Sequence, residues 1–342
     1  MTVREILAAI PALRVLVVGD VCLDRWCTYD PALALASRET GIPRVAVTGT
    51  EVTPGAAGTI ANNLAALGAG HVDVLGMVGD DGFGYELRRA LAVRGISPGL
   101  LVDAPGVPTF TYTKLLNGAT GEEDLPRVDF VYTQPVPESV ERAIVARLER
   151  AEYDVILVSD QAETAQGGVV TAPVRDTVER LAVSLRETVV WVDSRLRPEL
   201  FRHVVVKPNQ DEAEAASLRL LGRIDYAEWR RRMQLRALIV THGGDGAIVV
   251  DDRGERWSAG RRVDHPVDIC GAGDSFSAAA AMALKITGDP VQAAAFGNLV
   301  ASITIMKKGT GTATPTEVAV QFERQQNSPC VINELRGARR ST

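Results

Sequence analysis

The stretch VILVSDQAETAQGGVVTAPVRDTVERLAVSLRETVVWVDS, residues 155–194, decides the fold class of this chain. It begins and ends with short apolar runs, 155–158 and 189–192, and a helical pattern over 169–186 lies between them. Continuous β-branched runs of this length are typical of strands that are buried on both faces. A strand, a helix and a strand in this order predict a mostly parallel sheet with helices on both sides.

The same alternation continues along most of the chain. Further apolar runs lie at 15–18, 72–78, 204–206 and 238–240, and further helical patterns lie at 56–67, 85–93, 136–150 and 226–234. A hairpin signal at 247–251 and 256–259 precedes two small-residue helices at about 272–286 and 290–307. Ligands of parallel sheets bind at the carboxyl ends of the strands, so the polar residues that follow the runs are the first candidates for chemistry.

Two segments, about 22–50 and 107–133, interrupt this alternation. The second contains two half-exposed strand patterns around the turn Asn117-Gly118, which predict a small antiparallel excursion from the main sheet. Such an excursion can be a lid over a site, a dimerisation surface or an ordinary hairpin. Because no linker is visible, we predict one domain over 1–317 that carries this lid, followed by a peripheral tail at 318–342.

Composition excludes several classes of function. The formal net charge is −6 and aromatic residues make up 5% of the chain, so we expect no nucleic-acid partner and no membrane-surface partner. The four cysteines form no Cys-x-x-Cys pair, which argues against a structural zinc site and a disulfide framework. Residues 1–11 predict a short amphipathic helix and not a signal peptide, and no apolar run reaches membrane-spanning length, so we expect a cytoplasmic protein.

The strongest chemical signal is DICGAGDSF at 268–276, where a Gly-Ala-Gly turn leads into an apolar helix. The free N–H groups of a first helical turn, together with the helix dipole, make an anion site. Asp274 in this turn is poorly placed beside an anion if it only caps the helix. It suits a base that accepts the proton of a hydroxyl attacking a phosphate. A plain N-cap is the alternative that this motif alone leaves open.

These residues resemble the C-terminal signature of the ribokinase-like, or PfkB-type, carbohydrate kinases, Asp-Thr-x-Gly-Ala-Gly-Asp-x-Phe. Five more elements resemble the family in the same order: GDVCLD (19–24), PGAAGTIANNLAALGA (54–69), GMVGDDGFG (76–84), KPNQDE (207–212) and THGGDG (241–246). Together the six cover about residues 14–316. Within the family, the segments 19–25, 38–45, 127–130 and 157–160 are most similar to the heptose-7-phosphate kinase type.

The resemblance implies a ribokinase-like three-layer α/β/α domain with a small β lid. It also implies phosphoryl transfer from ATP, with Mg²⁺, to a hydroxyl of a small sugar or sugar phosphate. The family analogy further implies a homodimer, which we expect to form through the excursion at 110–132. A nucleoside or other small-alcohol kinase and a catalytically inactive ligand-binding homologue remain alternatives. A dinucleotide-dependent oxidoreductase is excluded, because the residues after the run at 15–18 read GDVCL and lack the Gly-x-Gly-x-x-Gly pattern.

The resemblance also implies roles for individual residues. Asp274 would be the catalytic base, and Gly271, Ala272 and Gly273 would present N–H groups to the transferring phosphoryl group. The expected ATP-binding residues are Asn209, Glu212, Thr241, Gly243, Gly246 and Asn298, with Glu212 organising Mg²⁺ through water. The expected substrate-binding residues are Asp24, Gly55, Ala56, Thr59, Arg127 and Asp160. Asp268 and the carbonyl of Cys270, together with the turn at 308–312, would form a monovalent-cation site, with K⁺ as the candidate cation.

Purely structural roles for some of these residues, and differences from the family pattern, limit what the resemblance implies. Asn209 and Glu212 can also be a helix cap with its N3 partner, and Asp24 can be a turn carboxylate. The family usually has Gly where this chain has Ala56, Asn where it has Thr59 and Thr where it has Cys270. The heptose kinases carry a lysine after the position of Asp160, whereas QAET at 161–164 supplies none, so binding of a phosphate on the sugar stays open.

Overall fold

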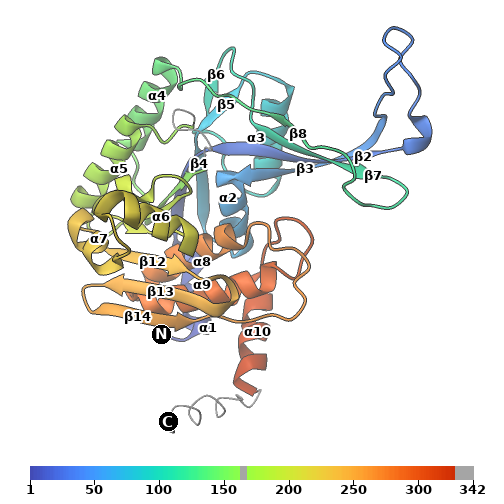
Figure 1. Cartoon of the computed structure of the whole chain (residues 1–342). Coiled ribbons are helices and arrows are strands. Elements are labelled where there is room, and N and C mark those ends of the chain that lie inside the picture. The colour runs from blue at the N-terminus through green and yellow to red at the C-terminus, as the bar shows by residue number, and fades with distance from the viewer. Residues whose placement is uncertain (162–167, 328–342) are drawn as a thin grey trace.

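The computed structural model describes residues 1–161 and 168–327. Within these residues, eight strands form the main sheet (Figure 1). In spatial order they are β14 (Gly254–Ala259), β13 (Gly246–Asp251), β12 (Ala237–Thr241), β11 (Val205–Val206), β10 (Val189–Ser194), β9 (Val155–Asp160), β1 (Arg14–Gly19) and β4 (His71–Leu75). The strands from β12 to β4 are parallel, and β13 and β14 are antiparallel. The predicted mostly parallel sheet is therefore confirmed.

Helices cover both faces of the main sheet, because successive strand residues point to opposite sides. The core on one face contains Val15 and Val17, and the core on the other contains Leu16 and Val18. The helices of the first face are α1 (Val3–Ala9), α2 (Ala57–Ala66), α3 (Gly82–Val93), α8 (Ala272–Thr287), α9 (Pro290–Thr304) and α10 (Pro315–Asn327). Those of the second are α4 (Glu138–Leu148), α5 (Ala172–Ser184), α6 (Gln210–Leu221) and α7 (Tyr226–Met233).

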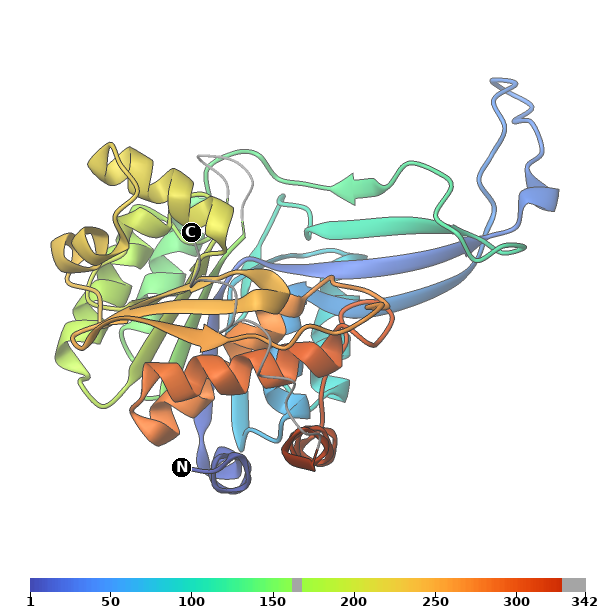
Figure 2. The same cartoon turned by 60° about the horizontal axis from the view of Figure 1, so that its bottom comes forward.

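A second sheet, called here the small sheet, consists of β3 (Val47–Ala56), β2 (Val21–Tyr29), β7 (Thr111–Asn117) and β8 (Val128–Phe130). It extends sideways from the body of the molecule (Figures 1 and 2). The two segments that interrupt the alternation thus share one sheet. The antiparallel pairing expected within the second segment is present between β7 and β8. The first segment joins it through β2, which is antiparallel to β3 and parallel to β7.

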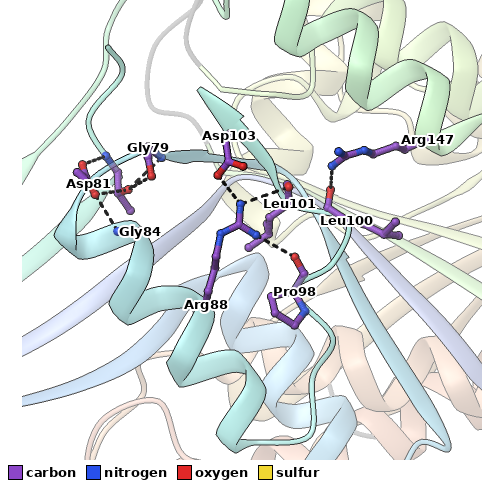
Figure 3. A network of polar contacts seen from close by, with 10 residues as sticks. Gly79, Asp81, Gly84, Arg88, Pro98, Leu100, Leu101, Asp103 and Arg147 are labelled. Carbon is purple, nitrogen blue, oxygen red and sulfur yellow. Dashed lines mark hydrogen bonds and ion pairs between the residues drawn. The ribbon is translucent and has the colours of Figure 1, made fainter. Parts of the chain in front are cut away.

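The predicted strand at 72–78 divides at Gly76 into β4 and β5 (Met77–Gly79), which pairs with β6 (Val102–Ala104). Asp81 caps the following helix, α3 (Gly82–Val93), by accepting the Gly84 N–H at 2.7 Å. The same carboxylate accepts the N–H and the hydroxyl of Thr109, at 2.9 and 2.8 Å (Figure 3). Thr109 lies two residues before β7, so this network fixes the root of the small sheet.

Arg88 of α3 extends the network toward β6. Its guanidinium donates to the carbonyls of Pro98 and Leu101 and pairs with Asp103 at 2.6 Å (Figure 3).

The predicted tail at 318–342 begins inside α10, where Val318 is fully buried, and residues 328–342 lie outside the described residues. No helix in the described part of the chain is long and apolar enough to cross a membrane.

Candidate active site

A cavity of about 200 Å³ lies where the small sheet meets the start of α8. Eight predicted site residues line it: Asp24, Ala56, Thr59, Arg127, Asp268, Cys270, Gly271 and Asp274. It is also lined by Gly309 and Thr310, from the turn at 308–312 that is expected at the cation site. The sequence did not single out the remaining lining residues: Arg25, Trp26, Tyr112, Lys114, Gln161 and Arg195. The structure therefore brings most of the expected substrate, cation and catalytic residues to one place, although they come from segments far apart in the sequence.

Gly271 begins α8 in the left-handed conformation, with φ at +76°. A Cβ here would come within 3.2 Å of Thr310 and 3.3 Å of Thr59, so only glycine fits easily. The first intrahelical hydrogen bond runs from the Ser275 N–H to the Gly271 carbonyl at 2.9 Å. The Ala272 N–H before it donates to the Ile269 carbonyl at 3.2 Å. The Gly273 N–H is a donor that an anion at a helix start can use.

Asp274 lies in this first turn and is half-buried. Burial raises the pKa of its carboxyl group to about 7, and the nearby Asp193 carboxylate also raises it, whereas Lys207 and Arg195 oppose the shift. A carboxyl group with a pKa near neutrality is present in both protonation states under ordinary conditions. That property suits a group that must accept a proton during a reaction.

Lys207 follows β11 and is 4% exposed. Its ammonium group pairs with Asp193 at 2.6 Å, and the Ser277 hydroxyl donates to the same carboxylate at 2.9 Å. Burial disfavours the charge on Lys207, but Asp193, Glu212 and Asp274 together raise its pKa. A Cβ added to Gly273 would lie 3.3 Å from the Lys207 Nζ, so this cation lies directly behind the first turn of α8.

Asp24 of β2 lies against the backbone of β3. A Cβ at Gly55 would come 2.5 Å from the Asp24 Oδ1, which explains the glycine there. Burial raises the pKa of Asp24 to about 6, while the Cys22 thiol, which donates to it at 3.6 Å, and the charges of Lys114 and Arg127 lower it.

Ala56 ends β3 on the wall of the cavity, with φ at +54°. An L-residue in this region is strained by about 1–2 kcal/mol. The strain gives a physical reason why the kinases that this chain resembles have glycine at the matching position. Thr59, one turn into α2, is 2% exposed, and its hydroxyl reaches the Pro54 carbonyl only at 3.5 Å.

Arg127 and Lys114 carry positive charge to the cavity from the small sheet. The Arg127 guanidinium lies 4.9 Å from the ring centroid of Tyr112 and donates to Asp129 at 2.8 Å. Lys114 lies on β7, as Tyr112 does, and its ammonium group is 3.4 Å from the Glu123 carboxylate. The only sequence signal for Lys114 and Tyr112 was their place in a half-exposed strand pattern, which does not distinguish a site residue from a surface residue.

Two predicted substrate residues, Gly55 and Asp160, are not on the cavity wall. Gly55 lies against Asp24, whereas Asp160 has other partners. Asp160 is 1% exposed and forms a two-point ion pair with Arg197, at 2.7 and 2.9 Å. The Ser194 hydroxyl donates to it at 2.7 Å. These contacts tie the carboxyl ends of β9 and β10 together. Of the segment 161–164, in which the sequence lacks a lysine, only Gln161 belongs to the described residues.

The predicted nucleotide residues gather at the ends of β11 and β12. Asn209 caps α6 by accepting the Glu212 N–H at 2.9 Å, and the Glu212 carboxylate accepts the Asn209 N–H at 2.8 Å. The cap that was considered as an alternative is thus present, and burial raises the pKa of Glu212. Asn209 also forms a parallel bridge with Thr241.

Close backbone contacts connect the turn after β12 to Asn298 of α9. Gly243 and Gly246 have φ values of +55° and +132°, and a Cβ at Gly246 would come 2.2 Å from the Ser258 carbonyl oxygen. Gly246 pairs with Ala259, whose carbonyl accepts from the Asn298 side chain at 3.4 Å. Backbone pairing and side-chain contacts therefore connect most of the predicted nucleotide residues, from Asn209 through the turn after β12 to Asn298.

Comparison with known proteins shows the family of this chain. The sequence model described as pfkB family carbohydrate kinase matches residues 12–317. The chain belongs to this family. It is therefore a carbohydrate kinase by descent, and the resemblance inferred from the motifs is confirmed.

The relatives of this kinase include bifunctional proteins. It is 32% identical over 330 residues to the bifunctional protein HldE of Methylococcus capsulatus, in a match that covers 92% of this chain and 64% of that protein. The bifunctional protein HldE of Nitratiruptor sp. is 29% identical, with 91% and 65% covered. The kinase thus spans less than two thirds of the length of these relatives.

Solved structures show the same fold. Ribokinase of Thermotoga maritima superimposes with a TM-score of 0.67 at 21% identity, covering 91% of this chain and 99% of that one. Phosphofructokinase-2 of Escherichia coli, solved in complex with fructose-6-phosphate, gives a TM-score of 0.66 at 18% identity, covering 92% and 99%. The predicted ribokinase-like fold is confirmed.

The protein residues expected to bind Mg²⁺ and K⁺ differ in how they are arranged. In the part of the chain that the structure describes, no group of three or more His, Cys, Asp or Glu side chains could hold a metal ion. Glu212, the carboxylate predicted to organise Mg²⁺ through water, is half-buried. Asp268 joins the two segments of the expected monovalent-cation site, because it accepts the N–H groups of Cys270 and Gly309 at 2.9 and 3.1 Å.

Proposed function

We propose that this kinase transfers the γ-phosphoryl group of ATP to a hydroxyl of a sugar phosphate, with Asp274 as the base. The observation that carries the proposal is the position of Asp274. It lies in the first turn of α8, on the wall of a cavity shared with Asp24, and burial raises its pKa to about 7. Asp274 would take the proton of the attacking hydroxyl as the oxygen bonds to phosphorus.

Charge that develops on the transferring phosphoryl group would be stabilised from two sides. The N–H groups of Gly271, Ala272 and Gly273 lie at the positive end of the helix dipole. The buried ammonium of Lys207 lies behind the same turn. Mg²⁺ would bridge the ATP phosphates and neutralise part of their charge.

The nucleotide would lie along the surface bordered by Asn209, Glu212, Thr241, Gly243, Gly246 and Asn298. Glycines at the turn after β12 keep side chains away from a ligand. A monovalent cation, K⁺ for example, at Asp268 and the Cys270 carbonyl would hold the loop that precedes α8. A crystal structure of Escherichia coli phosphofructokinase-2 contains potassium.

A sugar phosphate is favoured over a neutral sugar by the cations of the cavity. Arg25, Lys114, Arg127 and Arg195 line it together with the acids Asp24, Asp268 and Asp274. The lysine that the heptose kinases carry near position 161 is missing from the sequence. Lys114 of β7 and Arg127, which directly precedes β8, would take over binding of the phosphate. The small sheet would then act as the lid of the substrate site.

The test is ADP release from Mg·ATP with ribose, fructose 6-phosphate, a heptose 7-phosphate or inosine as the acceptor. Asp274→Asn is the blank, because the amide keeps the shape of the carboxylate but cannot accept the proton. We expect turnover on a sugar phosphate that disappears in the variant while ATP affinity stays nearly unchanged. Turnover on inosine alone would instead indicate a nucleoside kinase. Near wild-type turnover in Asp274→Asn would refute the assignment of the base.

We also propose that two copies of the chain pair through the small sheet. Apolar side chains of its outer strand and of the segment after it, Val128, Phe130 and Val131, are 43–53% exposed. A solved form of Escherichia coli phosphofructokinase-2 is tetrameric. Light scattering at micromolar concentration should give the mass of a dimer, and a monomer mass would contradict this proposal.

A further inference from the structure

One buried carboxylate outside the catalytic set holds several walls of the cavity. Asp20 lies between β1 and β2, at the carboxyl edge of the main sheet, and is 7% exposed. Its Oδ2 accepts the backbone N–H of Gln161 at 2.9 Å, and its Oδ1 accepts the backbone N–H of Val169 at 2.8 Å. The two bonds fix residues eight positions apart in the sequence to a single side chain.

The backbone of Asp20 extends this connection. Its N–H donates to the Ser159 carbonyl at 3.0 Å, and its carbonyl accepts the Ala57 N–H at 2.8 Å. Ala57 follows Ala56, and both Ala56 and Gln161 line the substrate cavity. Asp20 therefore contacts the backbone on two sides of the cavity, although it is not itself among the lining residues.

We propose that Asp20 is a positioning residue for the acceptor, which acts by holding Gln161 on the cavity wall. A carboxylate is the only side chain of this size that offers an acceptor oxygen to each of the two N–H groups. Hydrogen bonds to an ionised acceptor are shorter and stronger than bonds between neutral groups. The side-chain amide of Gln161 supplies both a donor and an acceptor, which suits a sugar hydroxyl. This inference rests on the proposed kinase function.

The proposal predicts a specific defect in Asp20→Asn. The amide offers one oxygen, and its NH₂ group would face an N–H donor, so one of the two bonds is lost. Gln161 then leaves its position, while the ATP side of the site, at the ends of β11 and β12, is not touched. We expect the KM for the acceptor to rise about tenfold or more. The KM for ATP should change less than twofold.

A matched control separates positioning from a general loss of stability. Asp73 on β4 is likewise 7% exposed, but it bonds to His71 and Tyr153 near the opposite edge of the main sheet. We expect Asp73→Asn to lower the melting temperature in the same way as Asp20→Asn and to leave the KM for the acceptor unchanged. An equal rise of that KM in both variants would show a merely structural role and overturn the proposal.

A double-mutant cycle tests whether Asp20 acts through Gln161. The acceptor is the member of the panel with the highest kcat/KM for the wild-type chain. If the proposal holds, Asp20→Asn adds little to the rise in KM that Gln161→Ala already causes. Fully additive effects would overturn it. If Asp20→Asn does not fold, Asp20→Glu replaces it, because it keeps the charge and shifts both oxygens, and the same non-additivity is required.

The outcome also distinguishes this proposal from the proposed function. If the wild-type chain phosphorylates an acceptor and Asp20→Asn keeps its KM, only the positioning role is refuted. If the wild-type chain phosphorylates no acceptor, the kinase proposal fails first and the positioning role fails with it.

Discussion

Replacing Lys207 by Met tests the electrostatics of the site most directly. The ammonium group lies 2.6 Å from the Asp193 carboxylate, and both side chains are almost fully buried. With an effective dielectric constant of about 20, Coulomb's law gives roughly 6 kcal/mol of attraction at this distance. Desolvation of both charges offsets part of it. Met keeps the length of the side chain but removes the charge, so Asp193 stays buried without its cation.

We expect Lys207→Met to lower the free energy of unfolding by about 3–5 kcal/mol, the usual cost of breaking a buried pair. Its partners raise the pKa of Lys207 above the ordinary 10.5, so the stabilisation is complete at neutral pH and is lost only as the pH rises through the folded value. The double variant Lys207→Met/Asp193→Asn removes both charges and should recover much of the loss. Urea unfolding at pH 7 measures all three free energies.

The same substitution should also move the pH profile of turnover. Lys207 lowers the pKa of Asp274, which is about 7 in the native site. Without the cation this pKa rises, so a smaller fraction of the base is deprotonated at neutral pH. The rise of kcat/KM between about pH 5.5 and 9 should therefore shift to higher pH. An unshifted profile, with stability lowered as expected, would refute the electrostatic link between Lys207 and the base.

Two further substitutions address the acceptor side. Lys114→Met should lower kcat/KM for a sugar phosphate about tenfold or more and leave that for the unphosphorylated sugar nearly unchanged, with the distant Lys285→Met as the control. An equal loss on both sugars would argue against a phosphate contact. Asp24→Asn should raise the melting temperature at pH 7, because the raised pKa of about 6 means that the folded chain loses up to about 3 kcal/mol as the pH rises from 3.8 through 6. The gain should vanish near pH 4, and a variant that is no more stable than the wild type at pH 7 contradicts it.

The layers of the fold could be predicted because their signals are local. Each strand from β9 to β12 is a short β-branched run that is buried on both faces, and that pattern is visible without knowledge of its neighbours. The helix α6 was missed because its buried residues are few and small, namely Ala213, Ala216 and Ser217. Only its N-terminal cap, Asn209 with Glu212, was visible in the sequence.

The small sheet could be predicted only as two separate segments. Its central pairing joins β2 to β7, about 90 residues apart in the sequence, and no local pattern specifies such a pairing. Leu23 pairs with Thr111, and Trp26 pairs with Lys114. Lys114 therefore reaches the substrate cavity through a contact that the sequence does not display, and the same holds for Tyr112.

The residues proposed for catalysis give local sequence signals, whereas the residues proposed for substrate specificity come together only through non-local contacts. Gly271 to Asp274 form one turn whose chemistry can be inferred from four consecutive residues, because helix geometry alone places the N–H groups and the carboxylate. Most other side chains of the cavity come instead from the small sheet, from Gln161 after β9 and from Arg195 after β10. The sequence shows the charge of each side chain, but only the folded structure shows that these charges lie around one cavity. Four cations facing three carboxylates favour an anionic acceptor, and the comparison of a sugar with its phosphate in Lys114→Met tests that inference directly.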